Sequence, residues 1–362
     1  MKTLSVCLIV KDEADVCARV LQSAAPFADE LIVVDTGSHD DTVAIANACG
    51  ARVEHFAWVD DFSAARNFAF SLAQSDYLMW LDADDVVPPE SAAAILAAKA
   101  HDFDEADTLM LPYHIAFTED GKASFTIVRE RILRRCAQAK WVGAVHEVVV
   151  PFGKILSLDA PIEHRKLRAS VAGRNLRIYE KMRAEGKTFS PREQFYYARE
   201  LCDNNRFAEA EPIFTTLLTA MPIHSPDRGA LYRGLAACRD ALGDVTGAMR
   251  WLLASGEHGC PSAVTCYAIA ERFFARGLWR AAADWYEKAL CEHGAAETFD
   301  APLLHGLYPC LQLCVCLDRL GEVAQAEAWN ERARQIDPQN SAVAQNLAYF
   351  ARLHAQIPAK KA

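Results

Sequence analysis

Short apolar runs alternate with helical segments over the first 100 residues, which narrows the folds open to this chain. Strands are predicted at 4–10, 31–34, 52–56 and 77–81, and helices at about 12–21, 41–49, 63–73 and 89–100. Asp12 is expected to cap the first helix. Alternation at this spacing is typical of βαβ units, in which helices cover both faces of a mostly parallel sheet. The sequence therefore predicts a doubly wound α/β domain.

The strand signal ends at about residue 174, where helical periodicity replaces it. Four segments each carry a turn residue with an alanine five residues further on. The turns are Asn205, Gly243, Gly277 and Gly321, and the alanines are Ala210, Ala248, Ala282 and Ala326. The spacings of 38, 34 and 44 residues bracket the period of about 34 typical of TPR repeats, with an insertion expected at about 291–302. The sequence predicts an all-α array of TPR-like helical repeats.

An acidic cluster follows the buried strand at 77–81. Asp82, Asp84 and Asp85 lie within four residues, and a double proline follows after two valines. If the strands wind outward and return beside the first, this cluster lies at the carboxyl edge of the sheet, where ligands bind. Such carboxylates repel one another unless a cation neutralises them, and hard oxygen ligands suit Mg²⁺ or Mn²⁺ shared with a phosphate. The alternative, a helix cap, explains one aspartate but not three.

Composition limits the location and partners of the protein. The net charge of -10 argues against a protein that binds nucleic acid non-specifically. The N-terminal apolar run has seven residues, too short for a signal peptide, and no stretch is long enough to span a membrane. The twelve cysteines contain no CxxC pair, so reduced buried thiols are favoured over zinc ligands. These features predict a cytoplasmic protein.

Four motifs together resemble the family 2 inverting glycosyltransferases of the GT-A fold. They are SVCLIVKDEA, ELIVVDTGSHDDT, the segment from FAWVDDFSAARN to LDADD, and WVGAVHEVV, and they span about residues 3–150. The combination with TPR-like repeats is similar to bacterial glycosyltransferases such as the peptide S-glycosyltransferases of glycocin biosynthesis. The resemblance implies a Rossmann-like GT-A domain, a nucleotide-sugar donor, usually a UDP-sugar, and a Mn²⁺ or Mg²⁺ cofactor.

The resemblance also assigns donor-binding roles. Asp82, Ala83 and Asp84 match the DxD motif, which holds the metal together with the ribose and diphosphate of the donor. Asp35 matches the carboxylate that holds the base. The other residues expected around the nucleotide are Val10, Glu13, Ser38, Arg66 and Asn67.

The general base is expected in the GAVHE segment. An inverting transfer needs a base that deprotonates the acceptor as it attacks the anomeric carbon. Glu147 or His146 could act as this base, and His146 could instead be a metal ligand with Asp82 and Asp84. The basic run at 129–140 is either a surface that steers an anionic substrate or a set of solvated strand and helix faces.

The resulting hypothesis is a metal-dependent glycosyltransferase that modifies a peptide or protein acceptor held partly by the repeat array. The predicted parts are a catalytic domain at 1–170, a linking helix at 171–190, repeats at 191–354 and a tail at 355–362. A lipid-linked or lipopolysaccharide-core saccharide and a modified nucleic-acid base are alternative acceptors. A non-enzymatic TPR adaptor is the alternative class, and the array could also form a homodimer.

Overall fold

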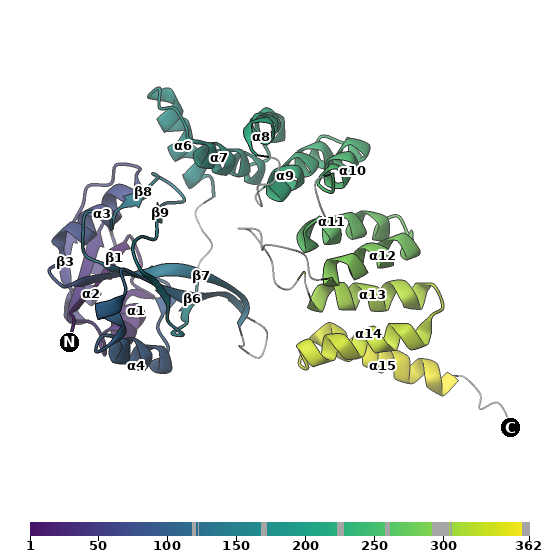
Figure 1. Ribbon diagram of the computed structural model, residues 1–362, viewed down its shortest axis with the longest axis horizontal. Helices are drawn as coiled ribbons and strands as arrows, with labels where there is room; N and C mark the ends of the chain where they lie inside the picture. The colour runs from purple at the N-terminus through teal and green to yellow at the C-terminus, as the bar shows by residue number, and fades with distance from the viewer. Residues whose placement is uncertain are drawn as a thin grey trace. The chain divides into compact units, whose positions relative to one another are not determined.

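The computed structural model describes residues 1–117, 121, 123–167, 172–222, 228–257, 261–291, 304 and 306–356. The chain divides into two compact units, 1–116 with 126–188 and 117–125 with 189–362. Strands gather in the first unit and paired helices make up the second (Figure 1).

The first unit is built on the predicted parallel sheet. β1 (Leu4–Val10), β2 (Glu30–Asp35), β3 (Arg52–His55) and β4 (Tyr77–Trp80) pair in the order β3-β2-β1-β4, all parallel. The helices between and after them are α1 (Cys17–Ala24), α2 (Thr42–Ala48), α3 (Phe62–Leu72) and α4 (Pro89–Ala98). The prediction that the first and fourth strands are neighbours is confirmed, and the carboxyl ends of β1 and β4 meet at one edge.

The sheet continues beyond β4 with strands that the sequence analysis did not assign. The order after β4 is β7 (Ala123–Arg134), β6 (Thr108–Phe117), β11 (Ile162–His164) and β5 (Asp85–Val86), and β10 (Ile155–Ser157) pairs with β6. β7 runs antiparallel to β4, and β11 antiparallel to β5. β8 (Trp141–Val142) and β9 (Val148–Val149) form a separate two-stranded sheet. The predicted doubly wound, mostly parallel fold is confirmed, with antiparallel pairs beside β4.

The first helix begins later than predicted, because the residues before it bind the next loop. Asp12 adopts a left-handed conformation with φ 53° and does not cap α1. Its N–H donates to Ser38 Oγ at 2.9 Å, and the Glu13 N–H donates to Thr42 Oγ1 at 2.8 Å. These bonds tie the loop after β1 to the loop after β2.

The second unit is an array of helical hairpins. Its pairs are α7 (Pro191–Asp203) with α8 (Phe207–Ala220), α9 (Arg228–Ala241) with α10 (Val245–Ala254), α11 (Ala263–Phe274) with α12 (Trp279–Leu290), and α13 (Leu307–Arg319) with α14 (Val323–Ile336), followed by α15 (Ser341–Gln356). The short α5 (Asp102–Glu105) belongs to the first unit. α6 (Arg174–Ala184), which lies in the segment predicted to link the domains, belongs to the first unit as well. The expected insertion after Cys291, and most of the predicted tail, lie outside the described residues.

The predicted repeat features are confirmed in the turns and at the helix crossings. The turn residues Asn205, Gly243, Gly277 and Gly321 all have left-handed φ values, between 60° and 84°. The alanines five positions later, Ala210, Ala248, Ala282 and Ala326, have no exposed surface. A small side chain is needed there because the paired helices pack closely. Among the described helices, none has both the length and the apolar character that crossing a membrane requires.

Removal of α15 is expected to destabilise the array. Val343 and Phe350 are 1% and 4% exposed and pack against α13 and α14. Truncation before Asn340 would expose these contacts, as loss of a terminal repeat does in other solenoids. Thermal unfolding of the truncated chain should begin at a lower temperature than that of the full chain. An unchanged melting curve would show that α15 contributes nothing to stability.

Candidate active site

Asp85 anchors the acidic loop from inside the protein. Its side chain is completely buried and receives the Arg131 guanidinium at 3.0 Å and the Tyr113 hydroxyl at 2.8 Å. The backbone N–H of Asp82 donates at 2.9 Å to Oδ2 of Asp85, the oxygen that also receives Arg131. Asp85 lies in β5, whereas Pro88 precedes α4, so Asp85 is not a helix cap. The third aspartate of the cluster therefore fixes the loop that presents the first two.

Arg131 is expected to be essential for stability. It has no exposed surface, pairs with the buried Asp85, and lies 3.6 Å from the ring centroid of Trp80. Arg131→Met would remove the guanidinium that pairs with the buried Asp85 carboxylate and should lower the free energy of unfolding by about 3–5 kcal/mol.

Arg134→Met is a matched control on the same strand. Arg134 pairs with Asp107, and both side chains are about one-third exposed. Loss of this pair should cost about 1 kcal/mol or less. Equal losses for the two variants in urea unfolding would contradict a special role for Arg131.

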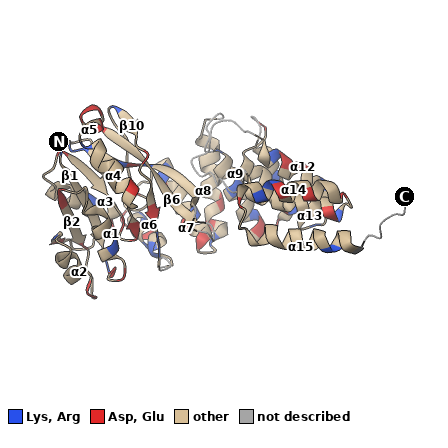
Figure 2. Ribbon diagram, turned by 90° about the horizontal axis from the view of Figure 1, so that it is seen from below, with Lys and Arg blue, Asp and Glu red and all other residues tan. Residues whose placement is uncertain are grey.

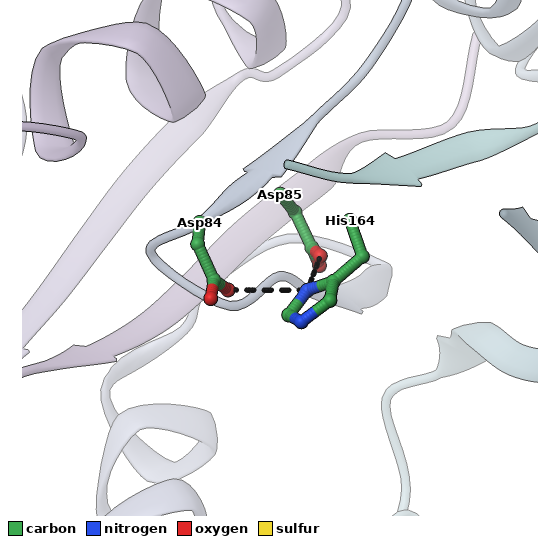
Figure 3. A group of neighbouring side chains, drawn as sticks. All are labelled: Asp84, Asp85 and His164. Atoms are coloured by element: carbon green, nitrogen blue, oxygen red, sulfur yellow. Dashed lines mark ion pairs between the residues drawn. The ribbon is translucent and has the colours of Figure 1, made fainter. Parts of the chain in front are cut away.

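Asp84 and His164 face each other across the loop. The antiparallel pairing of β11 with β5 aligns His164 with Asp85 and brings its Nδ1 to 3.3 Å from an Asp84 oxygen. Figure 3 shows both carboxylates directed at this nitrogen. Hydrogen bonds with Asp84 and Asp85 outweigh burial and raise the pKa of His164 to about 9. The imidazolium is therefore the local counter-ion of the two aspartates.

The same side chains could hold a divalent cation. Ligand atoms of Asp84, Asp85 and His164 lie within 4.8 Å of one another, and in the described ranges no other group of three carboxylate, imidazole or thiol side chains meets this criterion. Asp85 already has three partners, so Asp84 and His164 are the better ligands. Carboxylate oxygen with imidazole nitrogen fits Mn²⁺ well and Mg²⁺ less well.

Arg66 joins the acidic loop to Glu147. This α3 side chain donates from Nη2 to Asp82 at 2.6 Å and from Nε to Glu147 at 2.8 Å. Its guanidinium carbon lies 4.7 Å from the centroid of the Trp141 ring. Burial opposes ionisation of Asp82, but the charges of Arg66 and Arg131 outweigh it and lower the pKa of Asp82 to about 2. The Arg66 guanidinium therefore holds Asp82 on one side and Glu147 on the other.

Asn67, next to Arg66, supports this geometry. Its side-chain amide donates to the Trp141 carbonyl and accepts from the Trp141 N–H, both at 2.9 Å. Its hydrogen bonds thus fix β8, the strand that precedes Glu147. The sequence analysis assigned Asn67 to the nucleotide, whereas the structure pairs its amide with protein backbone.

Asp35 occupies the adjacent position at the end of β2. It is 3% exposed and accepts hydrogen bonds from the Gly37 and Ser38 N–H groups at 3.2 and 3.0 Å. Burial opposes ionisation, but hydrogen bonds from Ser38, His55 and Gly37 outweigh it and lower the pKa of Asp35. Gly37 has φ 106°, a conformation that favours glycine. Val10 ends the neighbouring β1, and its carbonyl accepts from Thr36 at 2.9 Å.

The structure brings together some of the sequence-predicted residues and separates others. Asp82, Arg66 and Glu147 form one bonded cluster, and Asp84 lies in the same loop. His146, in the loop between β8 and β9 with φ 52°, is not part of the group of possible metal ligands.

Sequence reasoning did not identify His164 as a candidate ligand, or Arg131 and Tyr113 as anchors of the loop. His164 ends β11, and its Nδ1 lies within hydrogen-bonding distance of the Tyr113 hydroxyl. No spacing signal connects it with residue 84. The basic run is only partly solvated, since Arg131 is buried and Arg129 stacks on Trp80.

Comparison with known proteins assigns the first unit. Residues 5–141 match the sequence model of the family described as Glycosyl transferase family 2. This part of the chain is therefore similar to family 2 glycosyl transferase domains. The matched range contains the strand ends with Asp35 and Asp82, as well as α3 with Arg66, and it ends just before Glu147.

Curated relatives carry names from two groups, TPR repeat proteins and glycosyltransferases. A TPR repeat-containing protein of Synechococcus elongatus is 36% identical over 149 residues, covering 41% of this chain and 36% of that protein. The prophage-derived glycosyltransferase SunS of Bacillus subtilis is 29% identical over 215 residues, covering 55% and 49%. An uncharacterized glycosyltransferase of Rickettsia felis is 40% identical over 90 residues, covering 25% and 31%. The chain thus spans between about a third and a half of the length of these relatives.

Proposed function

We propose that this protein is a metal-dependent, inverting glycosyltransferase that takes a sugar from a nucleotide diphosphate sugar, namely a UDP-sugar. The observation that carries the proposal is the Arg66 bridge between Asp82 and Glu147 inside a family 2 domain. This bridge keeps a predicted donor-binding carboxylate and a predicted base at one site. Names of relatives such as SunS support the same class of enzyme.

The donor would bind along the edge formed by β1, β2 and β4. Asp35, ionised and held rigidly by Ser38 and Gly37, can accept a hydrogen bond from a base N–H. Glu13 and Val10 lie beside it on the next strand end, where the backbone is tied to the Asp35 loop. Ala83 places only a methyl group between Asp82 and Asp84, which allows close approach of a ligand to the loop.

The cation would bind at Asp84 and His164, with Asp82 nearby. When bound, it would neutralise the charge that develops on the departing diphosphate. His164 must give up its proton to serve as a ligand, so it would change from counter-ion to ligand. His146 remains a proposed alternative ligand.

Glu147 would accept the proton of the acceptor. Its carboxylate is held by the Arg66 Nε–H and is about 13% exposed, which leaves part of it accessible. The fork of Arg66 fixes the direction of this carboxylate relative to Asp82. A base fixed on one side of the sugar, opposite the leaving group, is the arrangement that inversion requires.

The repeat array is proposed to hold a peptide or protein acceptor. Two cavities support this: one of about 320 Å³ lined by residues of α7, α8, α9 and α11, and one of about 220 Å³ lined by residues of α11, α13 and α15. The first has aromatic and basic walls, including Phe195 and Arg233, and the second has Tyr267, Gln312 and Asn346. In the ribbon of Figure 2, acidic and basic residues alternate along the helices, a pattern that suits a peptide better than nucleic acid. Action in the cytoplasm remains a prediction.

Isothermal titration with UDP tests the donor assignment. The full chain should bind UDP in the presence of Mn²⁺ and lose at least about tenfold in affinity when the metal is chelated, because the diphosphate charge is then unbalanced. A panel of UDP-sugars in thermal shift with Mn²⁺ would then identify the sugar. Equal binding with and without metal would contradict metal dependence, and binding of none of these nucleotides would contradict the donor class.

A further inference from the structure

Two cysteine thiols meet at the junction of the first two repeats. Cys202 in α7 and Cys238 in α9 have their sulfur atoms 3.7 Å apart. Both are free thiols, and Cys238 is completely buried, whereas Cys202 is half-buried. A disulfide requires a sulfur separation of about 2.05 Å, so the two atoms have to approach by about 1.6 Å, a movement on the scale of side-chain rotation.

The thiol pair occupies a position that the array uses again to join neighbouring repeats. The turns after α7, α9 and α11 close with equivalent backbone hydrogen bonds, to the carbonyls of Leu201, Arg239 and Phe273. Aligned on these bonds, Cys202 corresponds to Asp240, and Cys238 corresponds to Arg272. Asp240 and Arg272 form an ion pair between α9 and α11. The α7–α9 junction therefore has two thiols where the α9–α11 junction has a salt bridge.

The pair can be reached from outside. Cys202 lines the cavity of about 320 Å³, together with Phe195, Arg199 and Asp203. A cavity of this volume is many times larger than a water molecule and admits a peroxide molecule. The two sulfur atoms lie within hydrogen-bonding distance, so loss of one proton from the pair leaves a thiolate stabilised by the neighbouring thiol.

We propose that Cys202 and Cys238 form a reversible disulfide that fastens α7 to α9 when the protein meets a peroxide. The thiolate of the pair attacks one peroxide oxygen, hydroxide leaves, and a sulfenic acid forms. The hydroxide takes the proton of the second thiol and becomes water. The second sulfur attacks the sulfenic sulfur, the S–S bond forms, and the S–O bond breaks. The hydroxide released in this step takes a proton from solvent. Two thiols and one hydrogen peroxide thus give one disulfide and two waters. Thiol reductants reverse the reaction by exchange.

Mass spectrometry on the full chain tests the proposal. The exposed Cys136 and Cys291 are first replaced by serine so that they cannot join two molecules. After treatment with hydrogen peroxide and alkylation, a peptide containing Cys202 should be linked to one containing Cys238, with the loss of two hydrogens. Dithiothreitol should separate them. Recovery of both cysteines as alkylated thiols, or as singly oxidised acids without the link, would overturn the proposal.

Thermal unfolding provides a second readout. The oxidised chain should melt at a temperature about 5 °C or more higher than the reduced chain, because the bond closes the loop that contains α8. Cys202→Ser and Cys238→Ala should each remove this difference between oxidised and reduced samples, whatever their own stability. A peroxide-dependent rise that persists in either variant would show that other groups are responsible.

Discussion

Glu147→Gln is expected to lower the rate of sugar transfer by about 10²–10⁴-fold with little change in donor affinity. The substitution keeps the shape of the side chain and its ability to accept the hydrogen bond from Arg66 Nε at 2.8 Å. It removes the basicity that a hydroxyl acceptor needs, whereas a thiol acceptor, partly ionised near neutral pH, needs it less. The size of the loss therefore also reports the chemistry of the acceptor. Single-turnover transfer rates and UDP titrations on the same samples provide the measurement.

One control variant and one further test variant accompany this experiment. Glu105→Gln removes a carboxylate that is exposed and pairs with Lys154 at 2.8 Å, and it should leave the rate unchanged. Arg66→Lys keeps a positive charge but cannot span Asp82 and Glu147 with a planar fork, so it should also lower the rate. A normal rate in Glu147→Gln would place the base elsewhere. His146 would be the next residue to test, since it was the other predicted base.

Asp84→Asn is expected to abolish metal-dependent donor binding while leaving the fold intact. Asp84 is partly exposed and its ion-pair partner is His164 at 3.3 Å, so the substitution removes a ligand but no core contact. His164→Ala should weaken Mn²⁺ and UDP binding together. His146→Ala separates the two candidate ligands: it should leave metal binding unchanged if His164 is the ligand, and weaken it if His146 is. Titration of UDP with Mn²⁺ on the three variants gives the answer.

Asp82→Asn is expected to lower the stability of the first unit, whereas relief of repulsion between aspartates would raise it. The sequence alone predicts that neutralising one of three aspartates relieves repulsion. In the structure Asp82 receives the buried Arg66 at 2.6 Å, and Asp85 receives Arg131. Asp82→Asn therefore weakens a charge pair and should destabilise the first unit, in addition to weakening donor binding. An increase in melting temperature would contradict this account of the loop.

The parts of the site that follow from local sequence pattern were predictable. β2 ends on Asp35, β4 is followed two residues later by Asp82, and the parallel order β3-β2-β1-β4 brings those ends to one edge. Arg66 and Glu147 were singled out by motif resemblance, and the structure joins them directly through a hydrogen bond.

The parts that depend on strand register were not predictable. His164 meets Asp84 only because a three-residue strand pairs antiparallel with a two-residue strand, and neither is long enough to show periodicity. Asp12 looked like a helix cap, but its backbone N–H binds Ser38 from the next loop. Asn67 looked like a ligand-facing amide, yet both of its hydrogen bonds go to the Trp141 backbone. In each case the deciding partner lies more than 20 residues away.

Release of UDP from UDP-sugars is the most direct test of the central claim, that the acidic edge of this domain uses a divalent cation to activate a nucleotide sugar. Glycosyltransferases of this kind are expected to hydrolyse their donor slowly without an acceptor. The wild-type chain should release UDP from at least one UDP-sugar with Mn²⁺ or Mg²⁺, release should stop when the metal is chelated, and Asp84→Asn should release none. Metal-independent release, equal release by Asp84→Asn, or no release from any UDP-sugar would contradict the account.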